Sequence, residues 1–288
     1  MHPIDPTAVD EARRCYAEEI RFVANLTREE LVAAFAKVPR ENFLGPPPWQ
    51  RWDELGGYRE VPGGDPRDTY HNVPYALDPG RKLNNGLPSF VGSLIDASGA
   101  REGQHVAHIG CGAGYYTAIL AELVGEGGHV TAIEIDDVLA ERARENLEPW
   151  GQVDVKQADG TRFDPGAADV ILVSAGATHP KALWLERMLP RAKLIVPLTV
   201  DAPAHGSGWV LEVSHLAQGF AARFVSPVGI CPCLGGRDEA LNRLLSQAFQ
   251  RGKEELRKVR WLRRDAHVAA EECWFHGDDV CLSQAELR

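Results

Sequence analysis

The sequence predicts an α/β fold built on a parallel β-sheet, and three observations support this prediction. Strand-like apolar runs alternate with helix-like segments between residues 105 and 197. The run V-A-H-I-G-C-G-A-G-Y-Y, which ends at Tyr116, places three glycines between a strand and a helix. Two further strand-like runs, 209–214 and 220–225, follow around a short connection, as expected for an antiparallel edge.

The apolar pattern gives each element of this core its bounds. The predicted strands are 105–109, 129–134, 153–156, 168–173 and 192–197, and the predicted helices are 115–124, 137–147 and 180–189.

The glycine run predicts a loop that approaches a nucleotide cofactor. Glycines let the backbone turn tightly, and the helix that follows offers unpaired N–H groups at its N-terminus. A dinucleotide site needs G-x-G-x-x-G, whereas Gly110, Gly112 and Gly114 give G-x-G-x-G. This spacing favours S-adenosylmethionine (SAM) over NAD.

Two acidic residues follow the next strands of the predicted sheet. Glu134 ends the run H-V-T-A-I-E, 20 residues after Gly114, where a carboxylate can accept hydrogen bonds from both ribose hydroxyls. Asp159 opens the triplet D-G-T, a position suited to the adenine amino group, although an Asp-Gly turn alone explains it as well. We include their neighbours in the predicted cofactor site: His108, Cys111, Tyr115, Ile135, Gly160 and Ser174.

Composition narrows the class of partner. The chain has 288 residues and a net charge of -10, which argues against a nucleic-acid backbone as the main partner. No basic, apolar leader opens the sequence, and no apolar run approaches the roughly 20 residues of a membrane span. We therefore expect a cytoplasmic protein that contacts no membrane, with a protein, peptide or small molecule as its substrate.

The segments on either side of the core differ in character. Residues 8–25 and a segment that starts at the capping box T-R-E-E (27–30) predict two helices. Pro and Gly between residues 45 and 80 forbid long elements, and the aromatic residues there anchor either a surface-wrapping segment or a substrate-covering loop. After Gly235, residues 238–249 predict an amphipathic helix. We divide the chain into an N-terminal helical and loop region (1–82), a SAM-binding domain (83–234) and a C-terminal extension (235–288).

Several motifs together resemble the protein-L-isoaspartate O-methyltransferase family. They are V-P-R-E-N-F in the N-terminal region, a turn that ends at Pro88, I-G-C-G-A-G-Y, Glu134, A-D-G-T, A-D-V-I-L-V-S-A and L-I-V-P, ending at Pro197. The resemblance implies a Rossmann-like methyltransferase sheet with helices on both faces. It also implies methyl transfer from SAM to the free carboxylate of an isoaspartyl residue, a protein-repair reaction.

The sequence departs from the family pattern at two positions. The family's substrate turn carries a serine two residues before the proline, and this chain has Gly86 there. His108 stands where methyltransferases commonly carry an acid near the methionine end of SAM. We assign the acceptor site to the turn, with these candidate residues: Asn84, Asn85, Gly86, Pro88 and Ser89.

Three functions remain open at this point. The chain could methylate isoaspartyl carboxylates, the same fold could serve another peptide or small-molecule acceptor, or a SAM-binding protein could recognise damaged polypeptide without transfer. A carboxylate with a reference pKa near about 4 is ionised at pH 7, so the first reaction needs no general base.

The cysteines predict neither a disulfide scaffold nor a metal site. Six cysteines are sparse over this length, so we expect reduced thiols. Cys231, Cys233, Cys273 and Cys281, with His276, offer metal-capable groups, but none shows the paired C-x-x-C spacing of a zinc ribbon. We therefore expect no metal.

Overall fold

The computed structural model describes residues 5–53, 55, 57–201 and 206–285. The chain divides into two compact units. The first comprises Met1–Gln104 and Cys111–Gln157, and the second comprises His105–Gly110 and Ala158–Arg288. We describe each unit by itself.

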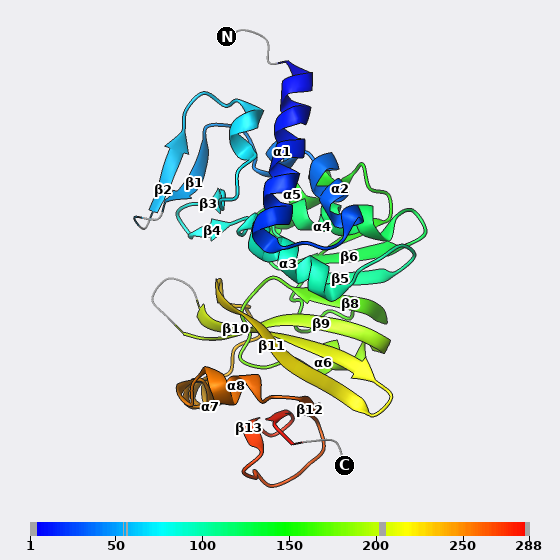
Figure 1. The fold of residues 1–288 in the computed structure, drawn as a ribbon, viewed down its shortest axis with the longest axis vertical. Coiled ribbons are helices and arrows are strands. Elements are labelled where there is room, and N and C mark those ends of the chain that lie inside the picture. Colours follow the sequence, from blue (N-terminus) through cyan, green and yellow to red (C-terminus); the bar gives the residue numbers. More distant parts are fainter. Residues whose placement is uncertain (1–4, 54, 56, 202–205, 286–288) are drawn as a thin grey trace. The chain divides into compact units, whose positions relative to one another are not determined.

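Three helices of the first unit pack together, and the first of them contacts each of the other two (Figure 1). They are α1 (Pro6–Ala24), α2 (Glu29–Lys37) and α3 (Pro88–Ser98). The predicted helix over 8–25 is confirmed, but the predicted capping box is wrong. The N-cap of α2 is Arg28, without a side-chain cap bond, and the hydroxyl of Thr27 donates instead to Asp96 of α3 at 3.5 Å.

Short elements fill the Pro- and Gly-rich segment of the first unit, in agreement with its composition. Two strands of five residues form an antiparallel hairpin, in which Trp49 pairs with Val61 and Trp52 with Tyr58. Trp49 and Tyr75 are buried in one cluster with Leu44, so aromatic side chains fix this segment. The elements are η1 (Arg40–Phe43), β1 (Trp49–Asp53), β2 (Gly57–Val61), η2 (Pro66–Thr69), β3 (Ala76–Asp78) and β4 (Leu83–Asn84).

The remainder of the first unit follows the α/β pattern. β6 (His129–Glu134) and β7 (Val153–Gln157) pair in parallel, and α5 (Asp137–Leu147) connects them. α4 (Tyr115–Val124) contacts β6. The bounds predicted for these four elements are confirmed to within one residue, because their apolar residues recur at clear strand or helix spacing.

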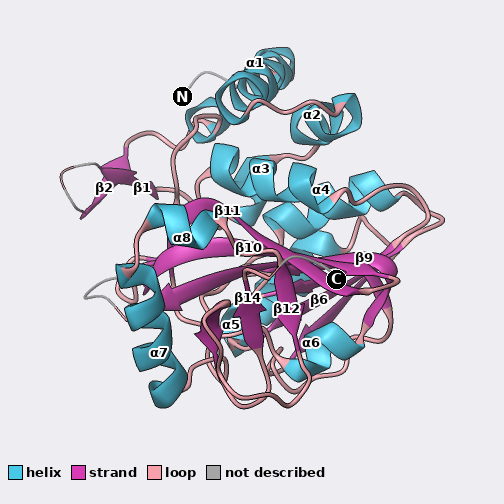
Figure 2. Ribbon diagram, turned by 60° about the horizontal axis from the view of Figure 1, so that its bottom comes forward, coloured by secondary structure: helices cyan, strands magenta, loops and turns pink. Residues whose placement is uncertain are grey.

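The second unit contains the long strands. β5 (His105–Ile109), β8 (Ala168–Val173) and β9 (Met188–Val200) are parallel neighbours in that order. β9, β10 (Gly206–Leu216) and β11 (Gly219–Ile230) continue antiparallel and lie side by side in Figure 2. The two predicted antiparallel strands are therefore confirmed, but they do not form the edge of the sheet, because β11 pairs on its other side with β12 (Trp261–Arg263).

One predicted element of the second unit is shorter than expected. The helix predicted over 180–189 is α6 (Ala182–Glu186), and β9 already begins at Met188. Met188 pairs with Ala168 of β8, so its place in the sheet sets the helix boundary.

The C-terminal part of the second unit adds helices and strands. α7 (Glu239–Gln250) confirms the predicted amphipathic helix, and α8 (Lys253–Arg257) follows it. β12 (Trp261–Arg263) pairs with β11 and with β14 (Cys281–Ser283), which in turn pairs with β13 (Cys273–His276). Within the described ranges, every helix is too short or too polar to cross a lipid bilayer.

Candidate active site

The glycine loop connects the end of β5 to the start of α4. Gly110, Gly112 and Gly114 have φ angles of 77°, 58° and 97°. This left-handed region is strained for residues with a Cβ and open to glycine. Gly114 is the N-cap of α4, so the free N–H groups of the first helical turn face the loop. The positive φ angles therefore explain why glycine occupies each of these three positions.

Glu134, at the end of β6, holds the first-unit half of this loop. Its buried carboxylate accepts hydrogen bonds from the backbone N–H of Gly112 at 2.8 Å, of Ile135 at 2.9 Å and of Asp136 at 3.0 Å. A carboxylate has about four lone-pair sites, so it retains capacity for a ligand hydroxyl. Glu134 therefore positions the loop while keeping acceptor capacity.

Three neighbours in the first unit take different places. Ile135, next to Glu134 in the chain, is 38% exposed, so its apolar side chain is accessible to a ligand. Cys111 is buried, and burial raises the pKa of its thiol, so it is a protonated residue that fills the loop. The ring of Tyr115 packs against the ring of Phe43, with 5.6 Å between the ring centroids. The side chain of Tyr115 is therefore engaged in packing, and only its backbone, at the start of α4, can serve the predicted site.

In the second unit, His108 and Ser174 meet at the ends of neighbouring strands. His108 Nε2 lies 3.0 Å from Ser174 Oγ, and the Ser174 N–H donates to Ile109 at 2.8 Å. Burial lowers the pKa of His108 to about 4, so the imidazole is neutral at pH 7. A Cβ on Gly110 would lie 3.6 Å from the Ser174 carbonyl carbon. The departure at His108 thus supplies a neutral polar group beside Gly110.

The two carboxylate oxygens of Asp159 have different partners. Its Oδ1 accepts from the Thr161 N–H at 2.9 Å and the Thr161 hydroxyl at 2.7 Å. Its Oδ2 lies 3.6 Å from Arg162 Nε. The carbonyl of Gly160 accepts from the indole of Trp184 at 2.8 Å, which anchors the turn in the core. The turn and the ligand interpretations are compatible, because each uses a different oxygen.

Residues just before the C-terminal extension, and Gly235 at its start, also reach this part of the second unit. Gly176, which follows β8, donates to the Cys231 carbonyl at 2.8 Å and accepts from the Cys233 N–H at 2.9 Å. A Cβ on Gly235 would lie 2.7 Å from Asp159 Oδ2. Gly235 was missed from the sequence, although the G-G pair at 235–236 was a signal of a close backbone approach.

The predicted acceptor turn lies in the first unit. Asn84 Oδ1 accepts from the Gly86 N–H at 2.9 Å, and Asn84 Nδ2 donates to the Tyr58 hydroxyl at 3.1 Å. Gly86 has a φ of 77°, and its carbonyl accepts from the hydroxyl of Tyr116 at 3.4 Å. Because Tyr116 belongs to α4, the structure links the acceptor turn to the helix that follows the glycine loop.

The remaining residues of the turn have fixed places. Pro88 is the first residue of α3. Ser89 Oγ accepts from Asn72 Nδ2 at 3.0 Å, and the Ser89 N–H donates to Asn72 Oδ1 at 2.9 Å. Asn85 Oδ1 accepts from the Tyr75 N–H at 2.8 Å, whereas the buried Asn85 Nδ2 has no hydrogen-bond partner among the described residues. A buried donor without a partner is costly, which marks Asn85 as a candidate ligand contact.

Arg40 supports this turn and was missed from the sequence. It lies in the V-P-R-E-N-F motif and is fully buried. Its guanidinium donates to the carbonyls of Thr69 at 2.8 Å, His71 at 2.7 Å and Val73 at 2.7 Å, and its Nη2 lies 3.4 Å from Asn85 Oδ1. The fork of donors on one arginine suits several carbonyls at once. An arginine in a motif of the resemblance was the available signal.

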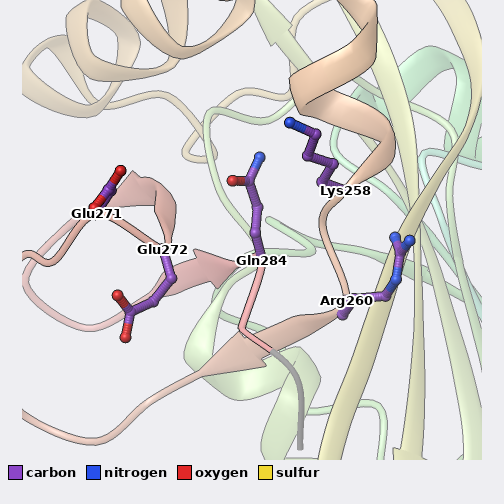
Figure 3. A pocket seen from close by; sticks show the side chains of 5 residues that line it. All are labelled: Lys258, Arg260, Glu271, Glu272 and Gln284. Carbon is purple, nitrogen blue, oxygen red and sulfur yellow. The ribbon is translucent and has the colours of Figure 1, made fainter.

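Two cavities are lined by residues other than those of the candidate site. The first has a volume of about 460 Å³ and is lined by side chains of both charges in the C-terminal part of the second unit (Figure 3). The second, of about 450 Å³ in the first unit, is lined in part by Tyr16, Tyr70 and His71. Neither contains a glycine of the loop, so the candidate site rests on the residues and their bonds. The residues of the first cavity are Lys258, Arg260, Glu271, Glu272 and Gln284.

Comparisons with known proteins agree on one family. A family profile described as protein-L-isoaspartate(D-aspartate) O-methyltransferase matches residues 65–205. The protein-L-isoaspartate O-methyltransferase 1 of Archaeoglobus fulgidus is 34% identical over 194 residues, which cover 66% of this chain and 80% of the relative. The corresponding enzyme of Ignicoccus hospitalis is 29% identical over 230 residues, which cover 78% of this chain and 99% of the relative.

Solved structures show the same fold. A protein-L-isoaspartate O-methyltransferase aligns with a TM-score of 0.57 and 19% identity over 81% of this chain and 69% of that chain. A putative protein-L-isoaspartate O-methyltransferase from Plasmodium falciparum, in complex with S-adenosyl-L-homocysteine, aligns with a TM-score of 0.58 and 14% identity over 77% of this chain and 97% of that chain. The predicted Rossmann-like methyltransferase fold is therefore confirmed, and the chain belongs to the protein-L-isoaspartate O-methyltransferase family.

Proposed function

We propose that this protein is a SAM-dependent O-methyltransferase that methylates the free carboxylate of isoaspartyl residues in proteins or peptides. The observation that carries the proposal is the bond between Gly112 and Glu134. It holds a glycine loop of left-handed conformation beside an acid at the end of the next strand, in a chain of this family.

The residues present fit SAM in their chemistry. We assign the ribose hydroxyls to Glu134, one face of the adenine to Ile135, and the adenine amino group to Asp159 Oδ2. The glycine loop offers close backbone approach to the methionine part, and the neutral His108 with Ser174 offers polar contacts there. When bound, SAM would supply a methyl group activated by its sulfonium.

The acceptor side needs placement more than acid–base chemistry. A carboxylate is already ionised at neutral pH, so the protein must hold one carboxylate oxygen in line and exclude water. Asn85 Nδ2, which has no hydrogen-bond partner among the described residues, and the hydroxyl of Ser89 are donors suited to a carboxylate. We therefore assign orientation of the acceptor to the turn that holds them.

A transfer assay tests the proposal. The protein is incubated with methyl-labelled SAM and either an isoaspartyl peptide or its aspartyl twin. Base-labile label in the isoaspartyl peptide alone is the expected result, and Glu134→Ala should abolish it while the exposed Glu148→Gln retains it. Labelling of neither peptide, with SAM binding retained, would refute isoaspartyl transfer and leave a recognition protein or a different acceptor.

One observation favours a second acceptor class. Gly86 replaces the family serine, and its φ of 77° shows a backbone that disfavours a side chain there. The same fold could therefore methylate another peptide or small-molecule carboxylate or hydroxyl. Labelled SAM with a panel of such acceptors tests this alternative, which predicts label in a panel member and none in the isoaspartyl peptide.

We also propose a cytoplasmic location. All six cysteines are free in the structure, as expected where thiols are kept reduced. Fractionation of the source cells with an antibody against the chain tests this assignment, and a membrane or exported pool would contradict it.

A further inference from the structure

Four metal-binding side chains converge in the C-terminal part of the second unit, outside the candidate active site. His267, Cys273, His276 and Cys281 each offer one ligand atom, and these atoms all lie within 4.8 Å of one another. Within the set, Cys273 Sγ lies 3.6 Å from His267 Nε2. Tetrahedral zinc, with bonds of about 2.0–2.3 Å, separates its ligand atoms by about 3.3–3.8 Å. The cluster already has nearly the size that zinc requires.

The local strand geometry explains how three of these residues reach one face. His276 pairs directly with Cys281 across the β13–β14 hairpin, and Cys273 pairs with Ser283. Residues three apart on a regular strand point to opposite faces, but the register shift between Cys273 and Phe275 inserts Trp274 as an extra residue. The bulge therefore brings Cys273 to the face that carries His276 and Cys281.

The fourth residue, His267, comes from the loop before the hairpin, and its hydrogen bond favours the tautomer in which Nε2 can bind a metal. His267 Nδ1 lies 2.8 Å from the backbone carbonyl of Asp265. A carbonyl can only accept, so this bond places the proton on Nδ1 and leaves the lone pair of Nε2 facing Cys273. Such a backbone partner on the second ring nitrogen is usual for a histidine that binds a metal.

Further contacts fit a metal-bound thiolate. The N–H of Ala270 donates to Cys273 Sγ at 3.4 Å, as expected for a sulfur that carries negative charge. His276 Nδ1 is buried and has no hydrogen-bond partner among the residues that the structure describes, which is costly without a ligand near the ring. Both sulfurs are buried free thiols.

The charges of the set select the metal. Two thiolates neutralise a divalent cation, and two neutral imidazoles complete a tetrahedral shell, so the whole site can be buried without net charge. Zinc accepts this mixture of sulfur and nitrogen ligands and prefers this geometry. Four protein ligands leave no open position for water, which is the arrangement of a structural site.

We propose that His267, Cys273, His276 and Cys281 form a structural zinc site that ties the loop between β12 and β13 to the terminal hairpin. The loop 264–272 has no regular secondary structure, so few backbone bonds hold it. On the hairpin, the ring of Trp274 packs against Phe224 and Phe249, with ring centroids 5.0 Å and 5.5 Å apart. Aromatic packing thus anchors the hairpin, and the metal fixes the loop.

Metal analysis of the full-length chain, purified without a polyhistidine tag, tests the proposal. We expect about one zinc ion per chain after expression in zinc-supplemented medium. Cys281→Ser and His276→Gln should lose most of it. The matched controls Cys15→Ser, an exposed thiol, and Cys233→Ser, a buried thiol outside the cluster, should retain it. When Co²⁺ replaces the zinc ion, the absorption spectrum should show the ligand-field bands of a tetrahedral site and thiolate-to-metal charge-transfer bands.

A second measurement on the unchanged chain does not depend on variants that fold. Alkylation followed by peptide mass spectrometry should show Cys273 and Cys281 protected in the native protein and modified after a strong chelator is added. Cys15 should react equally in both states. Three results would overturn the proposal: zinc-free protein from zinc-replete medium that also binds no Co²⁺, a Cys273–Cys281 disulfide in protein freshly purified with a reductant present, or cysteine protection unchanged by the chelator.

Discussion

The backbone N–H of Gly112 donates to the carboxylate of Glu134 at 2.8 Å, which joins the glycine loop to the end of β6. The same carboxylate accepts from Ile135 and Asp136. With the ribose assigned to the same carboxylate under the proposed function, mutating this one side chain should affect both loop position and SAM binding.

Glu134→Gln tests this double dependence. An amide has one acceptor oxygen and places an NH₂ group against a backbone donor, so it loses charge-assisted bonds that contribute about 1.5–3 kcal/mol each. We expect SAM affinity to fall by about 10-fold or more and the melting temperature to fall. Calorimetric titration and thermal unfolding measure the two effects. Glu148→Gln, on the surface, is the control, and unchanged SAM affinity in Glu134→Gln would contradict our placement of the ribose.

Gly86→Ala tests the conformation of the acceptor turn. A Cβ at φ 77° is strained and would lie 3.0 Å from Val91 Cγ2, so we expect a loss of about 1–2 kcal/mol in the free energy of unfolding. Urea denaturation measures this loss. Gly127→Ala is the matched control, because its φ is not positive and no neighbouring atom of the described residues lies within 4 Å of where its Cβ would stand. Equal stability of both variants would show that the turn adapts to a side chain, and Gly86→Ser could then present a hydroxyl.

Arg40→Lys tests the support beneath the turn. A lysine cannot donate in a fork to the three carbonyls that Arg40 contacts, so buried acceptors lose their partners at a cost of about 1–3 kcal/mol each. We expect lower stability and a higher KM for the acceptor peptide, with SAM affinity nearly unchanged. Arg14→Lys, on the exposed side of α1, should behave as wild type. A loss of SAM affinity equal to the loss of acceptor affinity would argue against a role at the turn.

The buried histidines predict a dependence of stability on pH. Burial lowers the pKa of His108 to about 4, whereas an unfolded histidine titrates near about 6.5. The unfolded chain binds the proton first as pH falls, so this contribution is complete above pH about 6.5 and is lost progressively toward about 4. At pH about 5.5 the loss is about 1 kcal/mol. Burial lowers the pKa of His179 in the same direction.

Urea unfolding at neutral pH and at pH about 5.5 measures this effect on the free energy of unfolding. His108→Gln should lose less stability between neutral pH and pH about 5.5 than wild type does, because one of the groups is gone. His129→Gln, at an exposed position, should keep the wild-type dependence. An identical dependence in His108→Gln would contradict a buried neutral imidazole.

Much of the central α/β pattern follows from the sequence alone. β5, α4, β6, α5 and β8 have the predicted bounds, because each is a continuous apolar or amphipathic segment ended by glycine or a polar residue.

Elements whose identity depends on a distant partner were harder to predict. β1 and β2 are five-residue strands, and β12 and β14 are three-residue strands defined by pairing with each other. The hydroxyl of Thr27 bonds to Asp96 rather than capping its own helix, which a local motif cannot reveal.

The candidate site divides in the same way. The glycine loop and Glu134 follow from spacing, since strand ends and turns are local. Arg40 and Gly235 contact residues far along the chain, at 69–73 and at 159 respectively, so their partners follow from the fold and not from local spacing. His267 is separated from Cys273 by a loop, and the C-x-x-H spacing of Cys273 and His276 is incomplete without it.

The pairing of β12 with β11 also bears on the tendency of the protein to self-associate. Phe220 and Ala221 of β11 meet Leu262 and Trp261 of β12, and β14 then covers β12. The terminal strands therefore cover this end of β11, which would otherwise offer free backbone groups to another chain, and the short strand β13 becomes the outermost strand. A chain stripped of this cover, by truncation or by loosening of the terminal hairpin, would expose a longer free strand edge, and we expect it to self-associate more readily.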